Sequence, residues 1–373
     1  MKVGRKKMKK VELRYSKKAV DRAGDYFSRI LSEEFFNDDT EVSSQEVIEA
    51  YETLNNWRAV HGYPINTFQA TLRNKLKSID QNAVVAQRLK RTPSIISKLA
   101  RFKGMKLSRM QDIGGLRAVV EDLSQVEELY NYYKNSNSKW KHQLVNEKNY
   151  IDNPKPSGYR GIHLVYRYYK NNPEIYNGLM IELQIRTRLQ HAWATAVETM
   201  GTFLNSSLKS SEGPDEWLSF FALASSAFAY LEGKSLIPGY EHLSREETFR
   251  TLVLEEKRLK ITEKLNVFRN ALKTISSDGR TGSYYLLVLE PDEKKLTYTA
   301  YGRDRLEEAT EHYLKEEQIS DGDNKRQVVL VKASSVESLK KAYPNYFLDT
   351  HEFLNVLRRI SKEVKKDKKE KAG

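Results

Sequence analysis

The sequence predicts an α+β protein in which a mixed central β-sheet is flanked by helices and followed by a smaller α+β domain. Four segments after Gly115 alternate β-branched or aromatic residues with polar ones, as strands do. Helical periodicity precedes and separates them. A Gly- and Ser-rich segment at 276–283 then breaks the pattern. We therefore expect a first domain at 1–243, a linking helix at 244–275 and a second domain at 276–373.

Apolar periodicity gives the helices of the first domain. It predicts helices over 15–36 and 43–60, a turn at 61–66, and a third helix from Thr67 to about Leu89. The four strands are expected at 115–122, 144–151, 162–169 and 179–186. Further helices are expected at about 123–135, 187–209 and 214–232.

The second domain has a different order of elements. A hairpin is expected at 284–290 and 295–301, followed by a helix over 303–317 and a strand over 327–333. The last helical stretch starts at Val336 and is broken at Pro344, because proline cannot continue a helix.

Composition excludes several kinds of site. The 373 residues include no cysteine, so disulfides, thiolate zinc sites and thiol nucleophiles are ruled out. The basic N-terminus is not followed by an apolar segment, and the longest mostly apolar stretch, Phe220 to Leu231, is too short to span a bilayer. We expect a cytoplasmic protein with no membrane partner.

Positive charge is concentrated at the start of the chain. Residues 1–18 carry nine Lys and Arg against Glu12 alone, within a formal net charge of +13 for the whole chain. Lys18, Arg22 and Arg29 recur at helical spacing and would form a stripe able to follow a phosphate backbone. A solvated tail is the alternative interpretation of the same run.

Polar residues alternate with apolar ones in three of the predicted strands. If these strands are neighbours, one concave face carries the following residues: Arg117, His163, Arg167, Glu182, Gln184 and Arg186. A sheet face that merely meets solvent would give the same pattern.

A basic segment, 88–104, precedes the first of these strands. A helix starting near Pro93 would present several of its cations together, with Ser94 in a first turn whose free N–H groups favour phosphate. Asp112 and Glu182 supply carboxylates opposite the cations. Oxygen ligands hold Mg²⁺ and cations balance phosphate charge, so this set suits a magnesium-bound triphosphate.

The loop 153–163 is rich in proline and glycine and carries an exposed tyrosine, Tyr159, available for stacking. Taken alone, it also fits an ordinary turn with a surface tyrosine.

Four ordered segments resemble the RelA/SpoT synthetase family, over roughly residues 45–235. They read RLKRTPSIISKL, MQDIGGLRAVVED, YIDNPKPSGYRGIHLVY and IELQIRTRLQHAWATAVE. The resemblance implies a nucleotidyltransferase-like fold and an enzyme that moves a pyrophosphoryl group from ATP to a ribose hydroxyl.

The resemblance also implies residue roles. Asp112 and Glu182 would hold Mg²⁺, and Glu182 would also take the proton from the attacking hydroxyl. Tyr159 would stack on the acceptor base. The ATP contacts implied are Arg88, Lys90, Ser94, Lys98, Arg117, Gln184 and Arg186. Lys155 and His163 would contact the acceptor, although His163 also fits a structural histidine. Ser157 departs from the asparagine usual in guanosine-tetraphosphate synthetases, which weakens the expectation of a guanine acceptor.

The second domain resembles the control module of the fused toxin–antitoxin subgroup of toxic small alarmone synthetases, the CapRel type. That module is a zinc-finger-like fold without its metal. The subgroup implies pyrophosphorylation of the 3′ adenosine hydroxyl of tRNA, and release of self-inhibition by a phage protein such as a major capsid protein. Tyr343 and Tyr346 match its Tyr-x-x-Tyr element, which is thought to block the ATP site; simple packing on the last helix is the alternative.

Three functions are therefore weighed. The first is a monomeric tRNA-pyrophosphorylating toxin held inactive in cis, with Lys17, Lys18 and Arg22 contacting the acceptor stem outside the pocket. The second is a small alarmone synthetase that makes (p)ppGpp or (p)ppApp. The third, a catalytically dead RNA-binding module, is disfavoured because Asp112 and Glu182 are both present.

Overall fold

A computed structural model describes most of the chain. The described residues are 11–30, 44–135, 141–170, 175–204, 206, 208, 211–271, 273–276, 282–302, 304–320, 326–333 and 335–370. Within this part of the chain, no helix combines the length and apolar character needed to span a bilayer.

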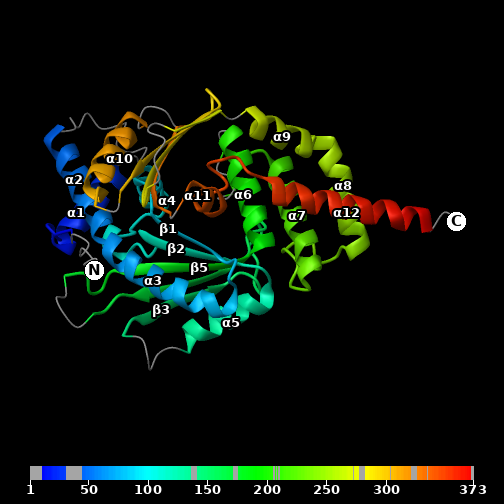
Figure 1. Ribbon diagram of the computed structural model, residues 1–373, viewed down its shortest axis with the longest axis horizontal. Coiled ribbons are helices and arrows are strands. Elements are labelled where there is room, and N and C mark those ends of the chain that lie inside the picture. The colour runs from blue at the N-terminus through cyan, green and yellow to red at the C-terminus, as the bar shows by residue number, and fades with distance from the viewer. Residues whose placement is uncertain are drawn as a thin grey trace, which may run out of the picture.

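One mixed sheet runs through the molecule (Figure 1). Its nine strands follow the order β3-β4-β5-β2-β1-β9-β7-β8-β6. Their bounds are β1 Val84–Leu89, β2 Gly114–Val120, β3 Gln143–Asn149, β4 Ile162–Arg167, β5 Met180–Thr187, β6 Lys273–Ser276, β7 Tyr284–Glu290, β8 Lys295–Tyr301 and β9 Gln327–Lys332. The β2–β5 and β6–β8 pairs are parallel and the other pairs are antiparallel. The predicted α+β class with a mixed central sheet is confirmed.

Helices cover this sheet on both sides. Their bounds are α1 Lys17–Ile30, α2 Ser44–Val60, α3 Gly62–Ile79, α4 Thr92–Arg101, α5 Leu123–Lys134, α6 Arg188–Phe203, α7 Asp215–Glu232, α8 Arg245–Leu259, α9 Ile261–Ala271, α10 Leu306–Ser320, α11 Val336–Ala342 and α12 His351–Glu370, with a short 3₁₀ turn, η2, at Leu107–Arg109.

The prediction for the segment after Thr67 was wrong in part. The helix α3 begins earlier, at Gly62, and accepts Pro64 in its first turn, where a missing N–H costs little. It ends at Ile79, and Val84–Leu89 forms strand β1 instead of continuing the helix. Its β-branched start suits a strand, and β2 and β9 supply hydrogen-bond partners on both sides that no local pattern reveals.

The expected linking helix is divided. Helix α8 ends where Lys260 adopts a left-handed conformation with φ of 54°, and α9 starts at the next residue. The Lys260 N–H bonds to the carbonyls of Glu256 and Lys257, which closes the last turn of α8. Strand β6 then joins the sheet beside β8. Most of the predicted linker, residues 277–281, lies outside the described residues, and the domain boundaries stay predictions.

The main core lies between α3, α5 and one face of the sheet. Ile65, Phe68 and Leu72 of α3 are buried there with Leu116 and Leu183 of the strands. This packing leaves the opposite face of β1, β2 and β5 for polar groups. Strand alternation accounts for the division, because successive side chains point to opposite faces.

A second core joins the end of the chain to its middle. Helix α12 crosses α7 and α8 (Figure 1). Phe353 of α12 packs against Phe221 and Phe228 of α7, with ring centroids 6.0 and 5.6 Å away. The chain therefore returns from β9 and α11 across the polar face of the sheet to this helical bundle. The break predicted at Pro344 is confirmed, because α11 ends at Ala342.

Candidate functional site

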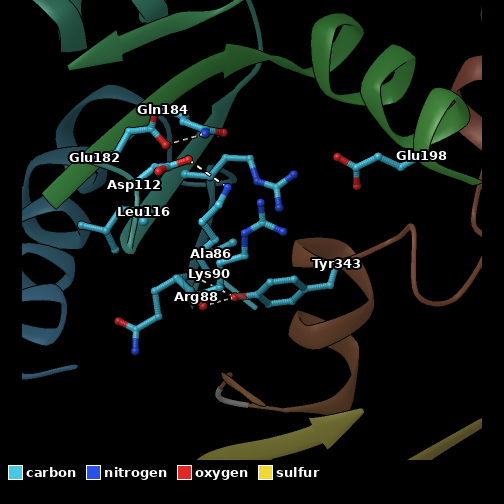
Figure 2. A pocket seen from close by; sticks show the side chains of 12 residues that line it. Ala86, Arg88, Lys90, Asp112, Leu116, Glu182, Gln184, Glu198 and Tyr343 are labelled. Atoms are coloured by element: carbon cyan, nitrogen blue, oxygen red, sulfur yellow. Dashed lines mark hydrogen bonds and ion pairs between the residues drawn. The ribbon is translucent and has the colours of Figure 1, made fainter. Parts of the chain in front are cut away.

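A polar cavity lies where β1, β2 and β5 approach α6 and the end of α11 (Figure 2). Strands supply most of its wall, while Glu198 reaches it from α6 and Tyr343 from the turn after α11. Its lining residues are Ala86, Gln87, Arg88, Lys90, Asp112, Gly115, Leu116, Arg117, Glu182, Gln184, Glu198 and Tyr343.

Strand register explains why these residues meet. Arg117 of β2 lies opposite Gln184 of β5, which lies opposite His163 of β4. On the other side, Arg88 of β1 lies opposite Gly115. Paired residues share a face of the sheet. The structure therefore brings together the polar face predicted for three strands, apart from Arg167, and extends it to β1, which the sequence pattern did not reveal. Arg167 lies opposite Met180 at the start of β5 and is outside the cavity lining.

Asp112 is held by two lysines. The Lys90 Nζ lies 2.9 Å from Asp112 Oδ2, and the Lys98 Nζ lies 2.9 Å from Asp112 Oδ1. Burial alone would raise the pKa of Asp112, but the two ammonium groups outweigh it and lower the pKa to about 2. The carboxylate is therefore ionised at any pH near neutrality.

Glu182 is held by a histidine and an amide instead. Its Oε1 lies 2.7 Å from His163 Nδ1, and its Oε2 accepts a 2.8 Å hydrogen bond from Gln184 Nε2. Burial and the nearby Asp112 charge raise the pKa of Glu182, whereas the hydrogen bond and electrostatic interaction with His163 and the hydrogen bond from Gln184 lower it, and the net shift is downward. Both acidic residues expected to hold a metal thus line one cavity.

Arginines make the rest of the cavity positive. Burial and the nearby Arg186 lower the pKa of Arg117 to about 10, while Glu198 acts against them. Among the charges near Arg88, Glu198 does most to raise its pKa. Glu198 is not among the site residues predicted from the sequence. Helix α6 starts directly after β5, but its own periodicity does not show that Glu198 faces the guanidinium groups of another strand.

Tyr159 is not the exposed residue expected in the loop. Only 4% of it is exposed, and its hydroxyl accepts a 2.7 Å hydrogen bond from Arg186 Nη2 and lies 2.5 Å from His163 Nε2. Stacking on an acceptor base therefore requires this side chain to leave its present position. The loop turns inward because Gly158, at φ of 89°, approaches Trp193 and α7 too closely for any side chain.

Tyr150 was missed by the sequence analysis. Its half-buried ring lies edge-on to the rings of Tyr159 and His163, with centroids 5.7 and 5.4 Å away. The exposed Lys155 lies over it, 4.6 Å from the ring centroid. The YI dipeptide before the loop was assigned to a strand, so nothing in the alternation marked Tyr150 as a neighbour of the acceptor residues.

Several predicted contacts lie away from the cavity lining. Ser94 is half-buried in the first turn of α4, and Lys98 reaches the site only through Asp112. Arg186 is almost fully buried behind Tyr159. The cations of α1 are exposed and outside the lining: Lys17, Lys18 and Arg22.

Tyr343 enters the cavity from the C-terminal part of the chain. Its hydroxyl accepts a 2.9 Å hydrogen bond from the Gln87 N–H and donates a short one to the Gln87 carbonyl, both on β1. Its ring is buried beside Arg88 and Arg117, and Tyr346 is also buried near Arg88. Tyr343 thus fills part of the space that faces the predicted ATP contacts (Figure 2).

The donor set suits magnesium better than a transition metal. In the described part of the chain, no group of three or more His, Cys, Asp or Glu is placed to hold a metal ion. Mg²⁺ differs in that it is commonly bound by one or two carboxylates plus substrate phosphates. A carboxylate offers about four lone-pair positions. Asp112 and Glu182 each use two of them in the contacts described above, so both fit as magnesium ligands.

Part of the chain is similar to known proteins. Residues 87–202 match the family described as "Region found in RelA / SpoT proteins". This segment, called the RelA/SpoT-type region below, begins within β1, ends near the end of α6 and contains every strand and helix between them. The predicted resemblance is confirmed for this region; the toxic subgroup stays a prediction.

Two relatives come from Bacillus subtilis (strain 168). GTP pyrophosphokinase YjbM is 36% identical over 117 residues, and GTP pyrophosphokinase YwaC is 32% identical over 114 residues. The matches cover 30% and 29% of this chain, and the chain spans about half of each relative, 52% in both cases. Among solved structures, small alarmone synthetase 1 from Bacillus subtilis bound to its product pppGpp is 26% identical, with a TM-score of 0.38, covering 46% of this chain and 90% of that one.

Proposed function

We propose that this chain is an ATP-dependent pyrophosphokinase whose acceptor is a free purine nucleotide, with guanine nucleotides as the first choice. One observation carries the proposal: Asp112 and Glu182 line a single cavity together with Arg88, Lys90 and Arg117. Asp112 and Glu182 offer oxygen ligands for Mg²⁺, and the three cations offer partners for phosphate oxygens, as a magnesium-bound triphosphate requires. The names of the relatives, both GTP pyrophosphokinases, support the choice of acceptor.

The reaction transfers the terminal two phosphates of ATP as one group. A ribose hydroxyl oxygen of the acceptor attacks the β-phosphorus, the bond from that phosphorus to the oxygen bridging it to the α-phosphorus breaks, and AMP leaves with the electron pair. The hydroxyl proton passes to Glu182, whose carboxylate His163 and Gln184 keep oriented and ionised. Arg88 and Arg117 would balance charge on the phosphates.

Magnesium would be held by Asp112 and Glu182. When bound, it supplies charge neutralisation across the phosphates. Lys90 and Lys98 keep Asp112 ionised before a metal binds, as its low pKa indicates.

The C-terminal part of the chain is proposed to inhibit the same site. Tyr343 lies in the cavity beside Arg88 and Arg117, where a nucleotide would need room. Two hydrogen bonds tie its hydroxyl to the backbone of β1. A bound nucleotide and a docked Tyr343 would compete, so activation requires Tyr343 to withdraw.

A tRNA acceptor is the second candidate. It is favoured by Lys17, Lys18 and Arg22, which are exposed on α1 outside the cavity, where a small nucleotide would not need them. In this candidate the target is the 3′ terminal adenosine hydroxyl. A phage protein such as a major capsid protein would bind the C-terminal part of the chain and withdraw Tyr343.

Product analysis separates these candidates. The wild-type chain and Tyr343→Ala are incubated with Mg²⁺ and ATP labelled at the β-phosphate, together with GDP, GTP, AMP or tRNA. We expect AMP release and label in the free nucleotide, most strongly for Tyr343→Ala. Label only in tRNA favours the second candidate. If Tyr343→Ala releases no AMP with any acceptor, the proposed activity is wrong.

A further inference from the structure

A buried polar cluster outside the cavity joins α10 to α2 and to the start of α4, and α10 lies beside α2 in Figure 1. The cluster consists of Arg58 on α2, Thr92 on α4, and Tyr313 and Glu317 on α10. Only 3% of the Arg58 side chain and 8% of the Glu317 side chain are exposed. An ion pair so deeply buried is costly unless its polar atoms are well satisfied.

Glu317 has a partner on each oxygen. Its Oε2 lies 3.1 Å from Arg58 Nη1, and its Oε1 accepts a 2.9 Å hydrogen bond from the Thr92 N–H at the start of α4. The Tyr313 hydroxyl accepts from Arg58 Nη2 at 2.5 Å and donates to Glu317. One carboxylate from α10 thus neutralises Arg58 and also caps the helix that carries Lys98.

Arg58 also reaches the segment that enters the cavity. Its Nε donates a 2.9 Å hydrogen bond to the Lys90 carbonyl, and its Nη1 donates a 2.7 Å bond to Thr92 Oγ1. The Lys90 side chain pairs with Asp112 on the cavity wall. Lys90 is therefore the single residue that connects Arg58 to the proposed metal ligand Asp112. Glu317 is the counter-charge of Arg58.

We propose that Glu317 is a latch, separate from Tyr343. It holds α10 and β9 against the RelA/SpoT-type region and thereby keeps Lys90 and Lys98 paired with Asp112. The inference rests on the proposed function of the cavity. It adds a buried charge outside the cavity that holds the inhibitory part of the chain docked, whereas Tyr343 occupies the cavity and bonds to the backbone of β1.

The charges explain why docking depends on this residue. Burial alone would lower the pKa of Arg58, but Tyr313 and Glu317 raise it above its ordinary value, so the guanidinium is charged in the docked state. Without the Glu317 charge, docking buries an uncompensated cation. When α10 moves away, water reaches Arg58 instead. Neutralising Glu317 therefore shifts the balance toward the undocked state.

The test compares Glu317→Gln with Glu311→Gln in the full chain. Glu311 lies on the exposed side of the same helix, so its variant controls for one lost charge on α10. Hydrogen exchange is measured by peptide for α10 and β9, with β2 and β5 as internal references. We expect exchange in α10 and β9 to be at least about tenfold faster in Glu317→Gln, with β2 and β5 unchanged. Exchange equal to that of Glu311→Gln overturns the latch.

A second variant covers the case in which Glu317→Gln loosens the whole molecule. Tyr313→Phe removes only the hydroxyl that bridges Arg58 and Glu317. It should raise exchange in α10 and β9 by at least about threefold, with β2 and β5 as in the wild type. No change in α10 and β9 overturns the proposal.

The exchange readout does not depend on catalysis. If Glu317→Gln loosens α10 and β9 but no variant releases AMP from ATP, the latch holds and the proposed function fails. If Tyr343→Ala is active while Glu317→Gln exchanges like the control, the latch fails and the proposed function stands. When both are correct, Glu317→Gln releases AMP at least about tenfold faster than the wild type.

Discussion

Two of the contacts that the C-terminal part of the chain makes near the cavity have opposite chemistry. Tyr343 enters the cavity as an uncharged ring, with its hydroxyl on the backbone of Gln87. Glu317 lies outside the cavity and is a buried charge on Arg58 and the α4 N-terminus. The Tyr343 contact has to break when substrate binds, and weak bonds between neutral groups break readily. The Glu317 contact holds two parts of the chain together, and a buried ion pair does this well because removing one partner strongly destabilises the docked state.

The largest effect is expected from the proposed base. Glu182→Gln in the Tyr343→Ala protein should lower AMP release by at least about a hundredfold, because a glutamine cannot accept the hydroxyl proton. Steady-state AMP formation measures this, and hydrogen exchange should show α10 and β9 as in Tyr343→Ala alone. Activity within a few-fold of the parent would remove Glu182 from the chemistry.

Tyr343 itself offers a graded pair of variants. Tyr343→Ala removes both the ring and the hydroxyl and should raise AMP release by about tenfold or more, since the cavity is then open in every molecule. Tyr343→Phe keeps the ring and loses only the bonds to Gln87, so a rise of about fivefold is expected. Equal activity of Tyr343→Phe and the wild type would mean that the ring alone closes the cavity.

The ion pairs of Asp112 predict a loss of stability in acid. The folded pKa of about 2 is below the ordinary value of 3.8, so the stabilisation is complete above pH 4 and is lost as the pH falls toward 2. The difference amounts to about 2 kcal/mol in the free energy of unfolding. Urea unfolding at pH 6 and pH 3 should show a smaller pH effect in Asp112→Asn than in the wild type. An identical pH effect in both proteins would argue against the ion pairs.

The smallest effect is expected on α1. Replacing Lys17, Lys18 and Arg22 with glutamine should leave AMP release with free nucleotides within about twofold, because these residues lie outside the cavity lining. With tRNA, the same change should lower the rate and its salt dependence. A comparable loss with GDP would show that α1 acts on the small acceptor as well.

Local patterns predicted most elements and the central polar set. Alternation was sufficient for Arg117, Glu182 and Gln184 because a strand's own sequence decides which side chains share a face. It failed for β1, which owes its conformation to pairing with β2 and β9, and at Lys260, where one left-handed residue divides a continuous helical pattern.

Contacts between segments far apart in the chain could not be predicted from local sequence patterns. Tyr159 was expected at the surface, yet it is buried and its hydroxyl contacts Arg186 and His163. Arg58 and Glu317, 259 positions apart, show no periodicity that relates them. The pairing depends on β9 joining β1, and only the assembled sheet reveals it.

The central claim is that Tyr343 and magnesium-bound ATP compete for one cavity. Calorimetric titration with a non-hydrolysable ATP analogue and Mg²⁺ measures this in the wild type, Tyr343→Ala and the control Glu311→Gln. We predict at least about tenfold tighter binding to Tyr343→Ala than to the other two proteins. Equal affinity in all three proteins, or no binding to Tyr343→Ala, would contradict the claim.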